Sequence, residues 1–293
     1  MEATVSVVVP TLNAGSDLEI LLQALFKQTV RPDEVLVVDS SSDDNTVSIA
    51  SSYEKVRVLS ISRASFDHGG TRHMAFLETS GEFVLFLTQD ALPADTLYIE
   101  NLLSPFSDSE VAMVSGRQIP KPDARRFEQL VREFNYPDES NVRSIEDLPK
   151  LGIKTFFASD VCSAYRRVPY LECGGFKRPC NTNEDMLMAA KLVRAGRKIA
   201  YVAKAKVLHS HNLSIREQYL RNVEVGISLE ANIDSLCGVD EVGEGGRLVS
   251  SVVRRLASER HFGELVAFGM DCSARFVGNR IGRMKVRLNR RNT

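Results

Sequence analysis

Short apolar segments alternate strictly with amphipathic segments through the first 115 residues, and this alternation restricts the fold more than any other feature. The apolar segments carry Val, Ile, Leu or Phe at nearly every position, which is typical of strands buried on both faces of a parallel sheet. Strands alternating with helices predict right-handed crossover units and a doubly wound α/β sheet, mostly parallel and flanked by helices. The predicted strands span residues 5–9, 34–39, 56–61, 83–87 and 111–115.

The segments between these strands have helical periodicity. In the first of them, Leu18, Leu21 and Leu25 recur on one face, and Ser16 is placed to cap the N-terminus. The chain of 293 residues is long enough to bury a substantial core under such helices. The predicted helices span residues 16–28, 44–53, 70–79 and 94–106.

The pattern becomes irregular after residue 115 and mostly helical after residue 214. Residues 155–165 and 198–208 are predicted strands, and residues 184–195 a helix that ends at Gly196. Residues 240–246 are turn-like and suit a linker before the last helices. The second half of the chain is therefore expected to extend the sheet and to end in helices.

Charge and cysteine content exclude several classes of protein. The 37 Lys and Arg residues balance 38 Asp and Glu residues, which argues against a nucleic-acid binder. No N-terminal segment has the pattern of a signal peptide, and no apolar run reaches about 18 residues, so we expect a cytoplasmic protein. The cysteines are odd in number and lack CxxC spacing, which favours neither a disulfide framework nor a zinc site. They are Cys162, Cys173, Cys180, Cys237 and Cys272.

Polar side chains follow the predicted strands, where no core explains them. Ligands of open α/β sheets bind beyond the carboxyl ends of the strands, so these segments predict the functional site. Neither GxGxxG nor GxxxxGK[ST] occurs, which excludes the common dinucleotide and P-loop sites. The segments span residues 10–13, 39–43, 62–63 and 88–91.

Two of these segments carry a family resemblance. VSVVVPTLN at residues 5–13 and VLVVDS at residues 35–40 resemble the opening of a family 2 glycosyltransferase with the GT-A fold. The pair Glu184-Asp185 and the motif HSH at residues 209–211 extend the resemblance to about residue 225. SFDHGGTRH at residues 65–73 is similar to a segment of bacterial rhamnosyltransferases in this family.

The resemblance implies three regions with different tasks. A GT-A catalytic domain is expected over residues 1–225, with the nucleotide-sugar half at about 1–115 and the acceptor half at about 116–225. A helical extension is expected over residues 226–293.

Residues near the first strands are candidates for binding the donor. Asp39 can accept a hydrogen bond from the ring N–H of uracil or thymine, as its family counterpart does, although it also suits capping of the following turn. Pro10, Thr11 and Asn13 would shape the pocket for base and ribose, and turn chemistry alone also accounts for them.

Basic residues near residue 70 are candidates for contacts to the diphosphate. Arg72 would contact it from the helix that begins near Gly70, with Arg63 assisting and His68 nearby. An ordinary salt bridge on a helix surface accounts for Arg72 equally well.

The resemblance also implies a metal site that contains Asp90. Family members usually place an acidic DxD motif after the fourth strand, whereas this chain has Thr88-Gln89-Asp90. Asp90 is therefore the candidate ligand for Mg²⁺ or Mn²⁺, and Gln89 is a candidate for bonding sugar or phosphate oxygens. His209 is the expected second ligand, with His211 as its competitor; a polar histidine at a strand end is the alternative for either.

Asp185 is the candidate catalytic base. Sugar transfer with inversion needs a base to deprotonate the acceptor hydroxyl as it attacks. Glu184 would orient the acceptor or a neighbouring group. Both acids also suit the N-terminus of a helix on electrostatic grounds, which is the alternative interpretation.

The last helix combines apolar and basic residues. Such a helix suits the surface of an anionic membrane, at the inner face of the plasma membrane, or a charged face packed on the domain or on another subunit. The basic residues are Arg275, Arg280, Arg283, Lys285, Arg287, Arg290 and Arg291, and the apolar ones are Phe276, Val277, Ile281, Met284 and Leu288.

The resemblance implies an inverting, metal-assisted transfer of L-rhamnose from dTDP-L-rhamnose to a cell-surface polysaccharide or its lipid-linked precursor, and the choice of sugar rests on the resemblance of residues 65–73 alone. One alternative is the same fold with a UDP-hexose donor. Others are a nucleotidyltransferase and a non-catalytic sugar-nucleotide-binding subunit of an assembly complex. The sequence leaves the acceptor, the linkage, the metal and the oligomeric state open.

Overall fold

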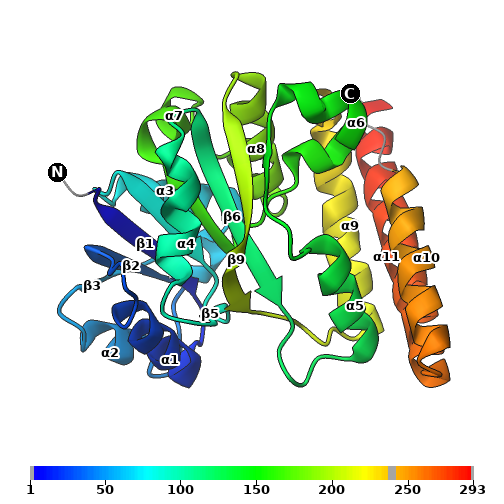
Figure 1. Ribbon diagram of the computed structural model, residues 1–293, viewed down its shortest axis with the longest axis horizontal. Coiled ribbons are helices and arrows are strands. Elements are labelled where there is room, and N and C mark those ends of the chain that lie inside the picture. Colours follow the sequence, from blue (N-terminus) through cyan, green and yellow to red (C-terminus); the bar gives the residue numbers. More distant parts are fainter. Residues whose placement is uncertain (1–2, 237–241, 292–293) are drawn as a thin grey trace.

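A nine-stranded sheet forms the centre of the protein in the computed structural model, which describes residues 3–236 and 242–291 (Figure 1). The strands are β1 (Val5–Thr11), β2 (Glu34–Asp39), β3 (Val56–Ser60), β4 (Phe83–Leu87), β5 (Leu92–Pro93), β6 (Val111–Ile119), β7 (Asn141–Arg143), β8 (Cys162–Arg166) and β9 (Lys198–Leu208). Their order is β3-β2-β1-β4-β8-β6-β9-β5, and β7 pairs with β9. The predicted α/β fold class is confirmed.

The first half of the sheet is parallel, as the uniformly apolar strands predict. β1 pairs in parallel with β2 and β4, and β2 pairs in parallel with β3. The direction changes at β8, which is antiparallel to both β4 and β6. Because β1, β2 and β4 run the same way, their carboxyl ends meet at one edge, where the predicted polar segments gather.

Helices cover both faces of this sheet. On one face, Val7 and Val9 pack with residues of α1 (Gly15–Phe26), α2 (Thr46–Ser51) and α4 (Tyr98–Leu103). On the other, Val8 packs with residues of α3 (His68–Leu77) and α8 (Glu184–Arg194). Val7 and Val9 thus point to one face of the sheet and Val8 to the other, and both faces are covered. β1 is therefore buried on both sides, as its lack of a polar face predicts.

Two local predictions are wrong. Ser16 does not cap α1, because the helix already begins at Gly15; instead the Thr46 hydroxyl accepts hydrogen bonds from the backbone N–H groups of Ala14 and Gly15, at 2.8 and 3.0 Å. A side chain distant in the sequence thus does the work of a cap. The strand expected over residues 155–165 is shorter, since a 3₁₀ turn spans Gly152–Phe156 and β8 begins at Cys162.

The C-terminal helices form a separate layer beside the sheet (Figure 1). α9 (Ile215–Ala231) packs along α11 (Phe262–Arg291), and α10 (Val242–Ser258) lies against α11 and α5 (Arg126–Asn135). α5, α10 and α11 share a small core of their own, built from Phe127, Leu130, Val131, Val252, Leu256 and Phe268.

Some predictions for this region end at the limits of the described residues. α10 begins at Val242, so the linker expected over residues 240–246 is wrong from residue 242 onward, while residues 240 and 241 lie outside the described residues, as does Cys237. α9 runs through the predicted boundary at residue 225, and the division there stays a prediction. Among the described residues, none of the helices has both the length and the apolar character needed to cross a membrane.

Short helices complete the described structure. α6 (Leu148–Leu151) follows β7, and α7 (Arg167–Glu172) follows β8. They lie in the region between β6 and α8, where the sequence pattern is irregular.

Candidate active site

A cavity of about 270 Å³ opens at the carboxyl ends of β1, β2 and β4. It holds many of the residues that the sequence assigned to donor binding: Pro10, Thr11, Arg63, His68, Arg72 and Gln89. Leu12, Ser40, Phe66 and Thr88 complete its lining. We call it the donor cavity. Segments far apart in the sequence therefore meet where the sheet topology places them.

Asp39 and Asn13 lie beside this cavity and organise its loops. The buried Asp39 carboxylate accepts hydrogen bonds from the backbone N–H of Ser42 at 3.0 Å and from the Ser42 hydroxyl at 2.5 Å. Asn13 has a φ of 50°, and its side-chain oxygen accepts a hydrogen bond from the Asp43 N–H at 2.8 Å. Both residues thus perform the turn role, and their contact with a nucleotide stays a prediction.

Gln89 and Arg63 also hold the backbone of the cavity wall. The Gln89 side-chain oxygen accepts from the Leu12 N–H at 2.8 Å, and its amide donates to the Leu12 carbonyl at 3.2 Å. The Arg63 guanidinium donates to the Ser41 carbonyl at 2.9 Å and pairs with Asp43. Gln89 and Arg63 therefore each have a structural role in these loops. Their binding of sugar or phosphate would come in addition to that role, and it stays a prediction.

Arg72 is buried behind the donor cavity, with 4% of its surface exposed, so a salt bridge on a helix surface is the wrong interpretation. Its Nη1 lies 3.0 Å from Oε1 of Glu184 and donates to Nδ1 of His68 at 2.8 Å. Its Nε lies 3.9 Å from Oδ2 of Asp160. Burial and the charge of Arg72 lower the pKa of His68 to about 4, so this imidazole is neutral and carries its proton on Nε2.

Asp185 stands at the start of α8, next to Glu184 and close to Asp160. Its carboxylate accepts hydrogen bonds from the backbone N–H groups of Met186 at 2.7 Å and Asp160 at 3.2 Å. Burial and the neighbouring charge of Glu184 raise the pKa of Asp185 to about 7. A carboxylate with such a pKa is matched to taking up a proton near neutral pH. The geometry therefore suits the predicted base, whose role stays a prediction.

Asp160 is a member of this acidic group that sequence reasoning missed. Its Oδ1 accepts hydrogen bonds from the hydroxyl groups of Ser163 at 2.6 Å and Tyr165 at 2.8 Å. Burial and the charge of Asp185 raise its pKa. Asp160, Glu184 and Asp185 thus place three carboxylates near the buried guanidinium of Arg72, and this excess of acid favours a proton held among them.

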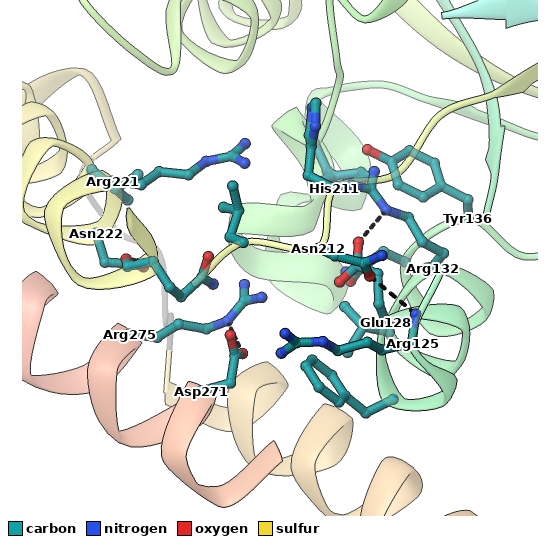
Figure 2. Close-up of a pocket in the computed structure, with 17 residues that line it drawn as sticks. Arg125, Glu128, Arg132, Tyr136, His211, Asn212, Arg221, Asn222, Asp271 and Arg275 are labelled. Carbon is teal, nitrogen blue, oxygen red and sulfur yellow. Dashed lines mark hydrogen bonds and ion pairs between the residues drawn. The ribbon is translucent and has the colours of Figure 1, made fainter. Parts of the chain in front are cut away.

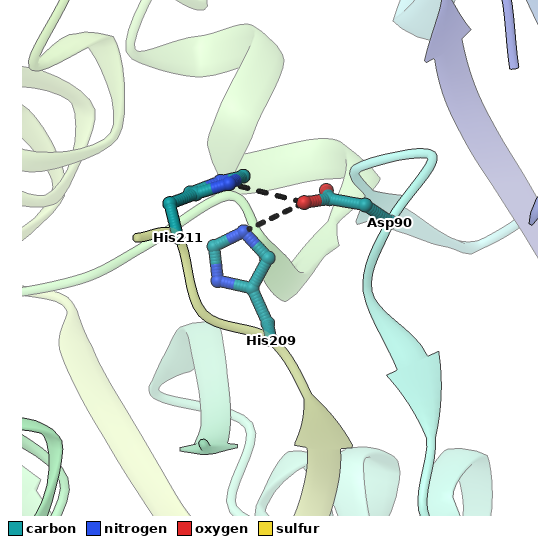
Figure 3. A group of neighbouring side chains, drawn as sticks. All are labelled: Asp90, His209 and His211. Carbon is teal, nitrogen blue, oxygen red and sulfur yellow. Dashed lines mark ion pairs between the residues drawn. The ribbon is translucent and has the colours of Figure 1, made fainter. Parts of the chain in front are cut away.

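Asp90, His209 and His211 converge on one point, although they come from two distant loops (Figure 3). The Nε2 atoms of both histidines lie 3.4 Å from Oδ2 of Asp90. One nitrogen or oxygen from each residue falls within 4.8 Å of the others, as metal ligands do. The sequence left His209 and His211 as competitors, and the structure places both against Asp90.

The protonation of this group suits a metal ion. Burial lowers the pKa of both histidines, even though Asp90 acts to raise them, so neutral imidazoles face the carboxylate. Burial alone would raise the pKa of Asp90, but its contacts with His209 hold it well below the usual range. Two imidazoles and one carboxylate fit Mn²⁺ better than Mg²⁺, which prefers oxygen ligands alone.

Gln118 supports this group and was also missed by sequence reasoning. Its side-chain oxygen accepts from Nδ1 of His209 at 2.9 Å, which leaves Nε2 free to bind a metal. The same oxygen accepts from Arg132, and the amide donates to Tyr136 at 2.7 Å. Its only signal in the sequence is a polar residue next to the end of β6, and the structure shows that this glutamine is buried.

Comparisons with known proteins agree with this geometry. The family model described as Glycosyl transferase family 2 matches residues 6–174. The O-antigen chain rhamnosyltransferase RfbN of Salmonella typhimurium is 40% identical over 95% of this chain and 89% of its own. The O-antigen chain rhamnosyltransferase WbaN of Salmonella anatum is 39% identical over the same shares.

A solved structure shares the fold. The mannosyltransferase PcManGT of Pyrobaculum calidifontis, in complex with GDP-Man and Mn²⁺, aligns with a TM-score of 0.64 over 95% of this chain and 87% of its own. Its sequence identity is 17%, so this likeness shows the fold alone.

Proposed function

The chain belongs to glycosyl transferase family 2, and from this premise we propose that it transfers L-rhamnose from dTDP-L-rhamnose to a cell-surface polysaccharide or to its lipid-linked precursor. Support for the sugar comes from two relatives named O-antigen chain rhamnosyltransferase, each alignable over 95% of this chain. The observation that carries the reaction is the convergence of Asp90, His209 and His211 on one point. Asp90 follows Gln89 in the sequence, and Gln89 lines the donor cavity, so this group of residues adjoins that cavity.

Each part of the site then has a task in an inverting transfer. The acceptor hydroxyl oxygen attacks the anomeric carbon while the bond from that carbon to the diphosphate oxygen breaks, and dTDP leaves. The carboxylate of Asp185 takes the hydroxyl proton. Mn²⁺ held by Asp90, His209 and His211 would neutralise charge on the departing diphosphate.

Arg72 and Glu184 are positioning residues in this proposal. Arg72 ties Glu184 and Asp160 into one buried group, and Glu184 raises the pKa of the neighbouring Asp185. Contacts of Arg72 with the diphosphate would add to this role, since its side chain also lines the donor cavity.

Calorimetric titration with dTDP, UDP, GDP and dTDP-L-rhamnose tests the donor. We expect the dTDP ligands to bind more tightly than UDP or GDP and to need Mn²⁺. Replacing Asp39 with Asn should weaken dTDP by about 10- to 100-fold, as the loss of a hydrogen bond to a charged group does. Asp138→Asn, at an exposed site, is the control. A preference for UDP would leave the family assignment intact and rule out dTDP-L-rhamnose.

We further propose that α11 contacts an anionic membrane. One face of this helix exposes apolar side chains along its length, with the basic Arg280 and Lys285 beside them. Other basic residues pack on the domain instead, because Arg287 pairs with Glu230 of α9 at 2.8 Å. The exposed apolar residues of α11 are Phe262, Val266, Met270, Phe276, Val277, Met284 and Leu288.

Flotation with lipid vesicles tests this contact. We expect binding to vesicles that contain phosphatidylglycerol and little binding to pure phosphatidylcholine. Replacing Met284 and Leu288 with Asp should reduce the bound fraction at least about fivefold, because about two buried apolar side chains are lost. Val253→Asp, on the exposed side of α10, is the matched control. Equal binding by both variants, or a dimer that the Asp pair dissociates, would contradict the membrane contact.

A further inference from the structure

A second cavity, of about 250 Å³, lies between α5, α9 and α11 (Figure 2). It shares no lining residue with the donor cavity, whose lining comes from residues 10–89. His211 lines its upper end in the view of Figure 2 and also contacts Asp90, so the cavity adjoins the metal-binding group. We call it the arginine cavity.

Four arginines and two acids line the arginine cavity. Nε of Arg132 donates to Glu128 at 2.8 Å, and Nε of Arg275 donates to Asp271 at 2.6 Å. Arg125 and Arg221 have no acidic partner within 4.0 Å in the part of the chain that the structure describes. Four cations against two carboxylates leave two positive charges, which a dianion would balance.

Arg221 is placed where an anion would relieve repulsion. Figure 2 shows its side chain extending from α9 toward His211, with Arg275 reaching in from α11. Arg221 is exposed to solvent at the cavity, yet the groups around it desolvate its guanidinium and lower its pKa, and the charges of Arg132 and Arg275 lower the pKa further. Asn212 and Asn222 add amide groups to the same lining, which supply neutral hydrogen-bond donors.

We propose that the arginine cavity binds a phosphate or diphosphate group carried by the acceptor, with Arg125 and Arg221 as its main contacts. This inference rests on the proposed function, which supplies a sugar acceptor. Guanidinium groups bind phosphate oxygens in pairs, and two of the four here lack a carboxylate to satisfy them. The donor is expected in the separate cavity at the strand ends, so the anion in the arginine cavity belongs to the second substrate.

Calorimetry with inorganic pyrophosphate and with farnesyl diphosphate tests this site. The buffer contains EDTA, so that binding through a metal ion does not contribute. We expect both ligands to bind the wild-type protein, and the double variant Arg125→Gln, Arg221→Gln to weaken both at least about tenfold. Arg254→Gln, an exposed arginine of α10, should leave both affinities unchanged. A parallel titration with dTDP and Mn²⁺ should give the same affinity for all three proteins.

The outcomes separate the possible sources of the anion. Unchanged pyrophosphate binding in the double variant would overturn the site. Weakened dTDP binding in that variant would show that the cavity holds the diphosphate of the donor. Binding of inorganic pyrophosphate by a wild-type protein that does not bind farnesyl diphosphate would show a site for a free anion. Either result overturns the acceptor assignment. A further outcome is that dTDP does not bind the wild type while both diphosphates still bind in a way that depends on Arg125 and Arg221. That result would refute the proposed donor and support diphosphate binding in the arginine cavity.

Discussion

Replacing Asp185 with Asn is expected to slow transfer by about 10²–10⁴-fold, the usual contribution of a general base, while dTDP affinity stays within about twofold of the wild type. The amide cannot take the hydroxyl proton, whereas the donor cavity does not include residue 185. Metal-dependent hydrolysis of dTDP-L-rhamnose, in which water serves as the acceptor, measures the rate, and calorimetry measures binding. Asp138→Asn, an exposed acid with no place in the site, should behave as the wild type.

The pH dependence of transfer and of stability in the wild-type protein provides an independent test of Asp185. Because burial raises the pKa of Asp185 to about 7, its base form is lost as pH falls, and kcat/KM should drop about tenfold per unit below pH 7. The folded protein also holds this proton more tightly than the unfolded chain, so the free energy of unfolding should fall as pH rises from about 4 to about 7.

Removal of the titrating group should weaken that trend. Asp185→Asn should show a smaller fall in unfolding free energy across this range, measured by urea unfolding at several pH values. An unchanged pH profile of transfer in a variant that remains active would contradict the role of Asp185 as base.

Replacing Asp90 with Ala should have the second large effect. Asp90 is the only carboxylate of the Asp90–His209–His211 group, so Mn²⁺ affinity should fall by more than the roughly 10- to 100-fold that loss of a supporting residue costs. Donor hydrolysis should fall about 100-fold or more, since a metal ion stabilises the leaving diphosphate by several kcal/mol. Isothermal titration with Mn²⁺ and the hydrolysis assay provide the two measurements.

A comparison of histidine variants sharpens this test. His209→Ala and His211→Ala should each weaken Mn²⁺ binding, because both rings face Oδ2 of Asp90 at 3.4 Å. His261→Ala is the matched control, because this histidine is half exposed and remote in the fold, near the start of α11. If Asp90→Ala binds Mn²⁺ with the affinity of the wild type, the proposal that Asp90, His209 and His211 hold the metal is wrong.

The parallel half of the sheet, which is expected to bind the nucleotide, was predictable because its strands are uniformly apolar. β1, β2 and β4 are buried on both faces, so nearly every residue is apolar and each strand ends where polar residues begin. The strand before α7 was harder to bound, since polar residues of the acidic group precede β8 and only five residues pair in it. Contacts between residues distant in the sequence, such as that of Thr46 in α2 with the start of α1, are also not predictable from a local pattern.

The candidate site divides in the same way. Asp90, Asp185 and His209 follow strands or begin a helix at positions that the family resemblance marks, so the sequence pointed to them. Asp160 and Gln118 act through partners that only the folded chain brings close. Arg72 illustrates the same limit: its position on a helix was equally compatible with a diphosphate contact and with a surface salt bridge, and only the fold shows that α8 buries it, with Glu184 at 3.0 Å.

The most direct test of the central claim is NMR of the sugar released from dTDP-L-rhamnose by the wild-type protein with Mn²⁺. We predict that rhamnose first appears as the anomer opposite to that of the donor, with one dTDP formed per sugar, and that Asp185→Asn forms it at least about 100-fold more slowly. Faster hydrolysis of UDP-glucose, release of the same anomer as the donor, or equal rates for the wild type and Asp185→Asn would contradict the account.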